Sequence, residues 1–254
     1  MVVLKLWSRS SARSTKFFVF HFQFVLMNIL FTKMLDEKEV SDVLGTDVSP
    51  EFLEVIKINF RKITPFNLEN KSLIFTSVNG VEAFFSNDFT PHEDFTGKNF
   101  NKIYCVGKKT KLALRKHGFG VFKMKKNAQE LAEFIVENCH EESFIHFCGD
   151  LALDILQKNL PLQNIGYKKV VVYETQLLYP KIEKKYDAIA FFSPSGVRSF
   201  VKENSLHFDH IFSIGETTTA EIAKHTDQKI FTGKQNDLSG LLKLIKQEIN
   251  KIQP

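Results

Sequence analysis

Short apolar runs alternate with longer segments of helical periodicity along most of this chain. Runs rich in Val, Ile, Phe and Tyr are typical of buried strands, whereas apolar residues spaced three and four apart are typical of amphipathic helices. The predicted strands are residues 28–32, 72–77, 102–107, 143–149, 169–175, 188–193 and 210–215. This alternation predicts an α/β fold with parallel sheets covered by helices.

Most of the predicted strands lead directly into a predicted helix. These helices begin after Ser77, Gly107, Gly149, Ser195 and Gly215. Two further amphipathic segments, "NAQELAEFIVENCH" and "LSGLLKLIKQEINKI", occupy corresponding places in the two halves of the chain. We also expect Ser77, Ser193 and Ser195 to act as helix N-caps, because serine oxygens accept hydrogen bonds from the first turn.

Two motifs are repeated in the same order. "FTSVNGVEAFF" (75–85) aligns with "FFSPSGVRSF" (191–200), so that Ser77 matches Ser193 and Gly80 matches Gly196. Each copy is followed by a second matching pair, "IYCVGKKTKLALRKHGF" (103–119) and "IFSIGETTTAEIAKHTD" (211–227). The chain therefore contains one structural plan twice.

The repeat predicts two Rossmann-like or flavodoxin-like domains. The C-terminal copy is too short alone and needs the strand and helix near Met27, so the second domain interrupts the first. We place the first, discontinuous domain at residues 27–59 and 175–254, and the second at 60–174. A two-stranded β linker, drawn from "VIKINFRKI" and "KKVVVYETQ", is expected to join them as a hinge.

Composition indicates an ordinary globular protein. The chain has 254 residues, of which 43% are hydrophobic, enough for two cores. Beyond residue 26, no apolar run reaches the roughly 18 residues of a membrane span. The three cysteines, Cys105, Cys139 and Cys148, show no CxxC spacing, which favours a reducing compartment. We therefore expect a cytoplasmic protein.

Residues 1–26 differ from the rest of the chain. They hold four of its 34 basic residues and none of its 29 acidic ones, so most of the net charge of +5 comes from this segment. A basic, serine-rich start and an apolar end would suit a targeting peptide. Because Met27 opens a predicted strand, we favour an upstream in-frame extension that lies outside the fold.

One internal segment is strongly basic. Residues 95–129 contain no acidic residue, and ten residues of this segment are Lys or Arg. Such a run is usually a solvated face, but its positive field would also suit a polyanionic ligand.

The joints between strands and helices could carry chemistry. Helix N-termini at the carboxyl ends of parallel strands favour anions, and glycine allows backbone to approach a ligand closely. The repeated joints therefore predict a cleft that binds carboxylates or phosphates. Any single joint could equally be a plain connection of an α/β fold.

Other site signatures are weak. No GxGxxG follows the first strand and no GxxxxGK[ST] occurs, so the phosphate-binding fingerprints are missing. "CHEESFIHFC" (139–148) could suggest zinc, but His146 and Cys148 alternate on a predicted buried strand. We interpret them as core residues.

Seven segments in this order and spacing resemble uroporphyrinogen-III synthase: "IFTSVNGVEAFF", "YCVGKKT", "NAQELAEFI", "FCGDLALDILQ", "VVVYET", "FFSPSGVRSF" and "SIGETTTAEI". The resemblance runs from about Met27 to the C-terminus. It implies a hydro-lyase of heme biosynthesis that cyclises hydroxymethylbilane with loss of water and inverts the last pyrrole ring. It also implies an active site between two α/β domains, a monomer, and no metal or organic cofactor.

The resemblance also implies site residues. The family's tyrosine in the second linker strand corresponds to Tyr173, which we expect to assist departure of the hydroxyl. The expected substrate-binding residues are Lys33, Ser77, Asn79, Gly80, Gly107, Thr110, Gly149, Ser193, Ser195, Gly196, Thr217 and Thr218. Lys33 stands where many relatives have arginine, and Glu216 adds a carboxylate at a helix start.

Two other classes of function remain open. The first is a non-catalytic cleft protein that holds an anionic tetrapyrrole or another polyanion, with Tyr173 as a packing residue. The second is a nucleic-acid binder that uses residues 95–129, which the neutral balance of the remaining chain disfavours. Tyr173 favours the enzyme, and we expect no nucleic-acid or membrane partner.

Overall fold

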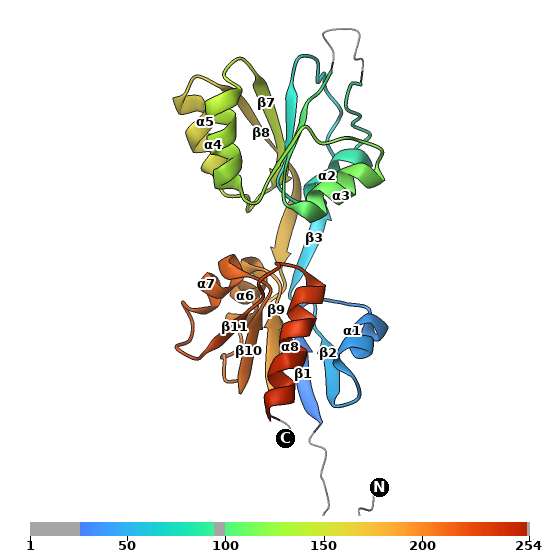
Figure 1. Ribbon diagram of the computed structural model, residues 1–254, viewed down its shortest axis with the longest axis vertical. Helices are drawn as coiled ribbons and strands as arrows, with labels where there is room; N and C mark the ends of the chain where they lie inside the picture. Colours follow the sequence, from blue (N-terminus) through green and yellow to red (C-terminus); the bar gives the residue numbers. More distant parts are fainter. Residues whose placement is uncertain (1–25, 94–99, 253–254) are drawn as a thin grey trace, which may run out of the picture.

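The computed structural model describes residues 26–93 and 100–252, which form two lobes (Figure 1). The lower lobe in Figure 1 contains a five-stranded sheet in the order β11-β10-β9-β1-β2, with every neighbouring pair parallel. Its strands are β1 (Met27–Phe31), β2 (Val48–Phe52), β9 (Ala188–Phe191), β10 (His210–Ser213) and β11 (Ile230–Thr232). Helices α1 (Glu37–Leu44) and α8 (Leu238–Ile252) cover one face, and α6 (Pro194–Val201) and α7 (Glu216–Ile222) cover the other.

The upper lobe contains a six-stranded sheet in the order β3-β8-β7-β4-β5-β6. β3 and β8 pair antiparallel, and the other neighbours are parallel. The strands are β3 (Ile56–Phe60), β4 (Ser72–Phe75), β5 (Ile103–Val106), β6 (Lys123–Lys125), β7 (Ser143–Gly149) and β8 (Gly166–Leu177). Helices α2 (Val78–Ser86) and α3 (Lys108–Lys116) cover one face, and α4 (Ala128–Asn138) and α5 (Ile155–Leu162) cover the other.

Successive side chains of a strand point to opposite faces of the sheet, so each sheet packs against two cores, one on each face. In β4, Leu73 and Phe75 pack on the α2 and α3 side, whereas Ile74 packs on the α4 and α5 side. A strand buried on both faces has a continuous apolar sequence, and "SLIF" has that character.

The two sheets share one spatial plan. In the order β8-β7-β4-β5-β6, the upper sheet corresponds to β2-β1-β9-β10-β11 in the lower sheet. The repeated serine motifs follow β4 and β9, and the repeated glycine motifs follow β5 and β10, so each motif occupies the same place in both lobes. The internal repeat is therefore structural.

Strands β3 and β8 run between the lobes (Figure 1) and pair from Ile56 with Leu177 to Phe60 with Tyr173. β3 lies within the first segment that we predicted as the linker, and β8 includes the second segment and extends beyond both of its ends. The predicted domain boundaries, at residues 59/60 and 174/175, fall inside these two strands. Those boundaries stay a prediction, as does the expectation for the N-terminal segment, because residues 1–25 lie outside the described part.

Two predicted helix starts are wrong. Helix α5 begins at Ile155, not directly after Gly149, because Asp150 still belongs to the sheet: its N–H donates to the Tyr173 carbonyl, and its side chain accepts from the N–H of Thr175. Helix α6 is capped by Ser193, not by Ser195, because Pro194 at the first helical position fixes the start.

Three strands were not predicted: β2, β6 and β11. All three lie at sheet edges. β2 contains Pro50, and β6 is the polar stretch "KMK", so neither shows the apolar pattern of a central strand.

Candidate active site

The carboxyl ends of the parallel strands in both lobes are directed toward the connection formed by β3 and β8 (Figure 1). In the upper lobe, β5 and β6 are added on one side of β4, and β7 and β8 on the other, so the direction in which strands are added reverses between β4 and β7. In the lower lobe, the same reversal lies between β1 and β9. Ligands of open α/β sheets bind outside such reversal points. The residues predicted for substrate binding follow these strands and their neighbours β5 and β10.

The α2 terminus and Tyr173 form one contact cluster. The Ser77 oxygen accepts a hydrogen bond from the Gly80 N–H at 3.0 Å and lies 3.0 Å from the Tyr173 hydroxyl. The Tyr173 ring packs on Gly149 so closely that a Cβ there would lie 2.4 Å from a ring carbon. Glycine is required at this position, because any side chain would displace the phenol.

Burial raises the pKa of Tyr173, and the hydrogen bond with Ser77 partly opposes that shift. The phenol is therefore protonated at neutral pH. Either hydroxyl can donate in the contact between Ser77 and Tyr173. In the arrangement in which Ser77 donates, the Tyr173 oxygen is the acceptor. The phenol proton is then available to a ligand in the cleft.

The equivalent α6 terminus is built in the same way. Ser193 accepts from the Gly196 N–H at 3.0 Å, and its oxygen lies 3.1 Å from that of Ser195. Ser195 and its repeat partner Asn79 both lie in the first helical turn and are partly exposed. Each of these two termini thus has one N–H occupied by its own serine.

The α3 and α7 termini differ, because glycine is their N-cap. Neither Gly107 nor Gly215 supplies a side-chain hydrogen bond to the first turn. Gly107 has a φ of 83°, which favours glycine. The α3 terminus therefore retains the N–H groups and partial positive charge that bind anions. At the α7 terminus, the Thr218 N–H already donates to the Gly215 carbonyl at 3.0 Å, which leaves the N–H groups of Glu216 and Thr217.

Predicted threonine ligands at these termini lie at different depths. Thr110 is 4% exposed and Thr218 is 1% exposed, so both side chains are directed into the fold. Thr217 is exposed at the start of α7 beside Glu216. Backbone N–H groups, rather than buried hydroxyls, are what the two termini offer to a ligand.

Two lysines bring positive charge to this region from opposite lobes. Lys33 follows β1, and Lys109 lies in the first turn of α3. The surrounding protein removes part of the hydration of the Lys33 ammonium and lowers its pKa, and the positive charge of Lys109 lowers it further. Like charges held this way attract an anion that lies between them.

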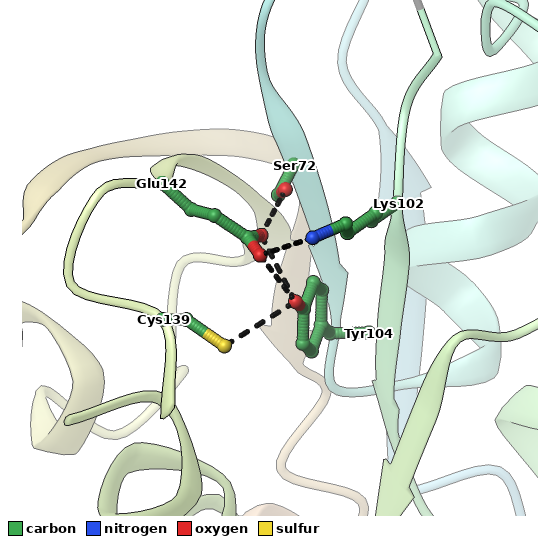
Figure 2. A network of polar contacts seen from close by, with 5 residues as sticks. All are labelled: Ser72, Lys102, Tyr104, Cys139 and Glu142. Carbon is green, nitrogen blue, oxygen red and sulfur yellow. Dashed lines mark hydrogen bonds and ion pairs between the residues drawn. The ribbon is translucent and has the colours of Figure 1, made fainter. Parts of the chain in front are cut away.

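A second polar cluster lies at the amino ends of the same upper sheet (Figure 2). Glu142 accepts hydrogen bonds from Ser72 at 2.5 Å, Lys102 at 2.7 Å and Tyr104 at 2.9 Å. Burial alone would raise the pKa of Glu142, but the hydrogen bonds outweigh it and the pKa is lowered. Every polar group here has a partner within the cluster, which suits a structural role.

Sequence reasoning missed one feature near the cleft. The Asn236 side chain, in the loop before α8, lies against Gly215, where a Cβ would meet its oxygen at 2.0 Å. The turn-like stretch "GKQND" was a possible signal for the loop. By contrast, the prediction that His146 is a core residue is confirmed, because its ring is buried and bonds the hydroxyls of Thr76 and Tyr167.

The described residues show neither a metal centre nor a membrane span. They contain no group of three or more His, Cys, Asp or Glu placed to hold a metal ion. None of their helices combines the length and apolar character needed to cross a membrane.

Comparison with known proteins agrees with this geometry. The family model for uroporphyrinogen-III synthase HemD matches residues 46–243. Uroporphyrinogen-III synthetase from Helicobacter pylori is 18% identical, with a TM-score of 0.63 over 87% of this chain and 99% of its own. A mutant uroporphyrinogen III synthase from Thermus thermophilus is 12% identical, with a TM-score of 0.62 over 89% of this chain and 99% of its own. At these identities, the structural matches support the fold.

Proposed function

The chain belongs to the uroporphyrinogen-III synthase family, and on that basis we propose how its residues divide the work of binding and catalysis. The activity of the family is that of a lyase in heme biosynthesis, which converts hydroxymethylbilane to uroporphyrinogen III. The resemblance of the seven sequence segments is thus confirmed. The observation that carries the assignment of roles is the cluster of Ser77, Gly149 and Tyr173 where β4 and β7 of the upper lobe end.

We propose that the open N-termini of α3 and α7, together with Lys33 and Lys109, hold carboxylates of the substrate. The bilane carries eight carboxylates on its acetate and propionate arms. One anion at an exposed helix terminus is stabilised by only about 0.3 to 1 kcal/mol. Several such contacts from both lobes are therefore needed to fix the two ends of the chain, and two matched lobes supply them.

Tyr173 is proposed as the group that assists loss of the hydroxyl. The C–O bond of the hydroxymethyl group breaks, its oxygen takes up a proton and leaves as water, and a cationic azafulvene remains. The phenol lies 3.0 Å from the Ser77 hydroxyl, and we propose that Ser77 donates to the phenol oxygen, which leaves the phenol proton for the departing hydroxyl. Ring closure then depends on bringing the terminal pyrroles together.

The remaining residues on the predicted list are proposed as the walls of the same cleft. Ser193, Gly196 and Ser195 form the α6 wall, and Asn79 and Gly80 form the α2 wall opposite. Their hydroxyl, amide and backbone groups suit carboxylate arms, and no metal or organic cofactor is needed for this chemistry.

We further propose a cytoplasmic monomer that acts without nucleic acid or membrane. All three cysteines are buried and unpaired, which suits a reducing compartment. Outside residues 1–25, basic and acidic residues nearly balance, which gives nucleic acid no general attraction.

Movement about β3 and β8 is proposed as the closing step, with the domains divided at residues 59/60 and 174/175. A bulky polyanion must enter the cleft and then be enclosed, so ligand should compact the protein. We expect a smaller radius of gyration by solution scattering with product bound. Equal radii with and without product would contradict the hinge.

The function itself is tested with freshly prepared hydroxymethylbilane. The protein should form the type III ring isomer faster than the type I isomer forms spontaneously. A non-catalytic binder would shift neither the rate nor the isomer ratio, although it would still bind the bilane.

A further inference from the structure

Helix α3 of the upper lobe carries four cations within one arc of its surface, which we call the basic face. Its members are exposed or partly exposed, and within residues 26–93 and 100–252 none of them takes part in an ion pair. The basic face consists of Lys108, Lys109, Arg115 and Lys116. No acidic residue lies between 100 and 129, and Glu82 of α2, which reaches the end of α3, contacts His117 at 3.1 Å and none of these four cations.

The basic face begins at the cleft and leads away from it. Lys108 and Lys109 form the first turn of α3, where Lys109 acts on Lys33 of the other lobe. The Gly107 N–H donates to the Lys125 carbonyl at 2.9 Å, which holds the end of β6 beside that turn. Arg115 lies seven residues along the helix, about 10 Å from Lys108 at 1.5 Å per residue.

The fold does not require this charge. Helix α7 occupies the equivalent place in the lower lobe, and Glu216 and Ala223 stand there where the upper lobe has Lys108 and Arg115. The α7 region is also internally neutralised, because Glu221 lies 2.8 Å from the Lys224 ammonium and 3.5 Å from the Arg198 guanidinium. The cations near α7 thus form ion pairs with Glu221, whereas the cations of the basic face form no ion pair with any described residue and are exposed to solvent.

We infer that the basic face collects the octa-anionic bilane from solution and directs it into the cleft. This inference rests on the proposed function, because it takes the substrate from it. A surface field of one sign raises association rates by about 10- to 1,000-fold at low ionic strength. Rapid capture is useful here, since the free bilane also cyclises spontaneously to the type I isomer.

The test compares two double charge reversals of equal net charge. Arg115→Glu with Lys116→Glu alters the outer part of the basic face, away from the first turn of α3. Lys185→Glu with Lys202→Glu is the control, because these exposed lysines lie before β9 and at the end of α6, on the side of the lower lobe away from the cleft. For each protein, kcat and kcat/KM for free hydroxymethylbilane are measured over a range of ionic strengths.

At low ionic strength, we expect kcat/KM of the Arg115 and Lys116 variant to fall about tenfold while kcat stays within twofold. The loss should shrink as salt is added, because the Debye length falls from about 30 Å at 0.01 M to about 8 Å at 0.15 M. The control variant should match the unaltered protein. Equal kcat/KM for both variants at low salt, or a loss that salt does not change, would overturn the inference.

Docking of an acidic protein is the other use of such a face. Leu112 is 61% exposed among these cations and would contact a docked protein, whereas a carboxylate field does not need it. We therefore expect Leu112→Ser to leave kcat/KM unchanged. A loss that appears only when another enzyme produces the bilane in the same solution would assign the face to protein docking and overturn substrate capture. If the unaltered protein forms no type III isomer, the proposed function fails instead.

Discussion

The upper sheet carries similar polar side chains at the two ends of its strands, but they serve different purposes. We call the amino ends of the strands the structural edge and the carboxyl ends the cleft edge. At the amino ends of the strands, Glu142 is held by three donors, and the cluster satisfies itself (Figure 2). At the carboxyl ends, Tyr173 has one hydroxyl partner, and the α3 terminus has no side-chain cap. Unmet hydrogen-bonding capacity, rather than polarity itself, therefore distinguishes the cleft edge from the structural edge.

The largest expected effect comes from the cleft edge. Tyr173→Phe removes the phenol but keeps the ring on Gly149, and we expect kcat to fall about 100-fold, the lower end for general acid assistance. KM should change little. Tyr167→Phe is the matched control on the same strand, because its hydroxyl bonds buried His146 and not the cleft. Full turnover by Tyr173→Phe would make the tyrosine a packing residue.

A substitution at the structural edge should lower the free energy of unfolding and leave catalysis unchanged. Glu142→Gln weakens three hydrogen bonds, and we expect a loss of about 2 kcal/mol in the free energy of unfolding with kcat unchanged. The folded-state pKa of Glu142 is lowered, so its stabilisation is present above the unfolded pKa of about 4.3 and is lost as pH falls through the folded value. Denaturant titrations from pH 3 to 7 should show the two proteins converging at the acidic end. A constant difference across that range would contradict this assignment.

The paired serine caps separate a structural from a functional contact. Ser77→Ala and Ser193→Ala each remove an N-cap, and we expect each to cost about 1 kcal/mol of stability. Ser77→Ala should also slow turnover several-fold, because only Ser77 contacts Tyr173. Equal turnover by the two variants would show that the Ser77 contact does not matter for catalysis.

The smallest expected effect is at Lys33. One carboxylate contact is worth about 0.3 to 1 kcal/mol at low salt, so Lys33→Met should raise KM about two- to fivefold with kcat unchanged. Lys33→Arg should lower KM, because a guanidinium can hold a carboxylate bidentately. Steady-state kinetics of the pair decide the matter, and a KM that neither change moves would exclude Lys33 from substrate binding.

Much of the fold could be predicted from sequence because local patterns and tertiary positions agree in the central strands. "SLIF" and "AIAF" are buried on both faces, so their composition alone identifies them. Edge strands β2 and β6 escaped prediction, because an edge strand needs no continuous apolar run. The delayed start of α5 depends on the bond from Thr175 to Asp150, a contact between distant residues that no local pattern contains.

In the candidate site, too, features marked by a local sequence motif could be predicted, and features that depend on tertiary contacts could not. The serine and glycine joints were recognisable because the repeat displays each of them twice. The contact between Tyr173 and Gly149 was not, since it depends on the register of β7 and β8 at a bulge. The burial of Thr110 and Thr218 likewise depends on helix packing, so the sequence could name these threonines but not show where they point.

The most direct test of the division between the two edges is the rate of type III isomer formation by Tyr173→Phe and Glu142→Gln, each corrected for its folded fraction. We predict that Glu142→Gln matches the unaltered protein once this correction is made, and that fully folded Tyr173→Phe is about 100-fold slower. Equal losses in the two variants, or full turnover by Tyr173→Phe, would contradict the account.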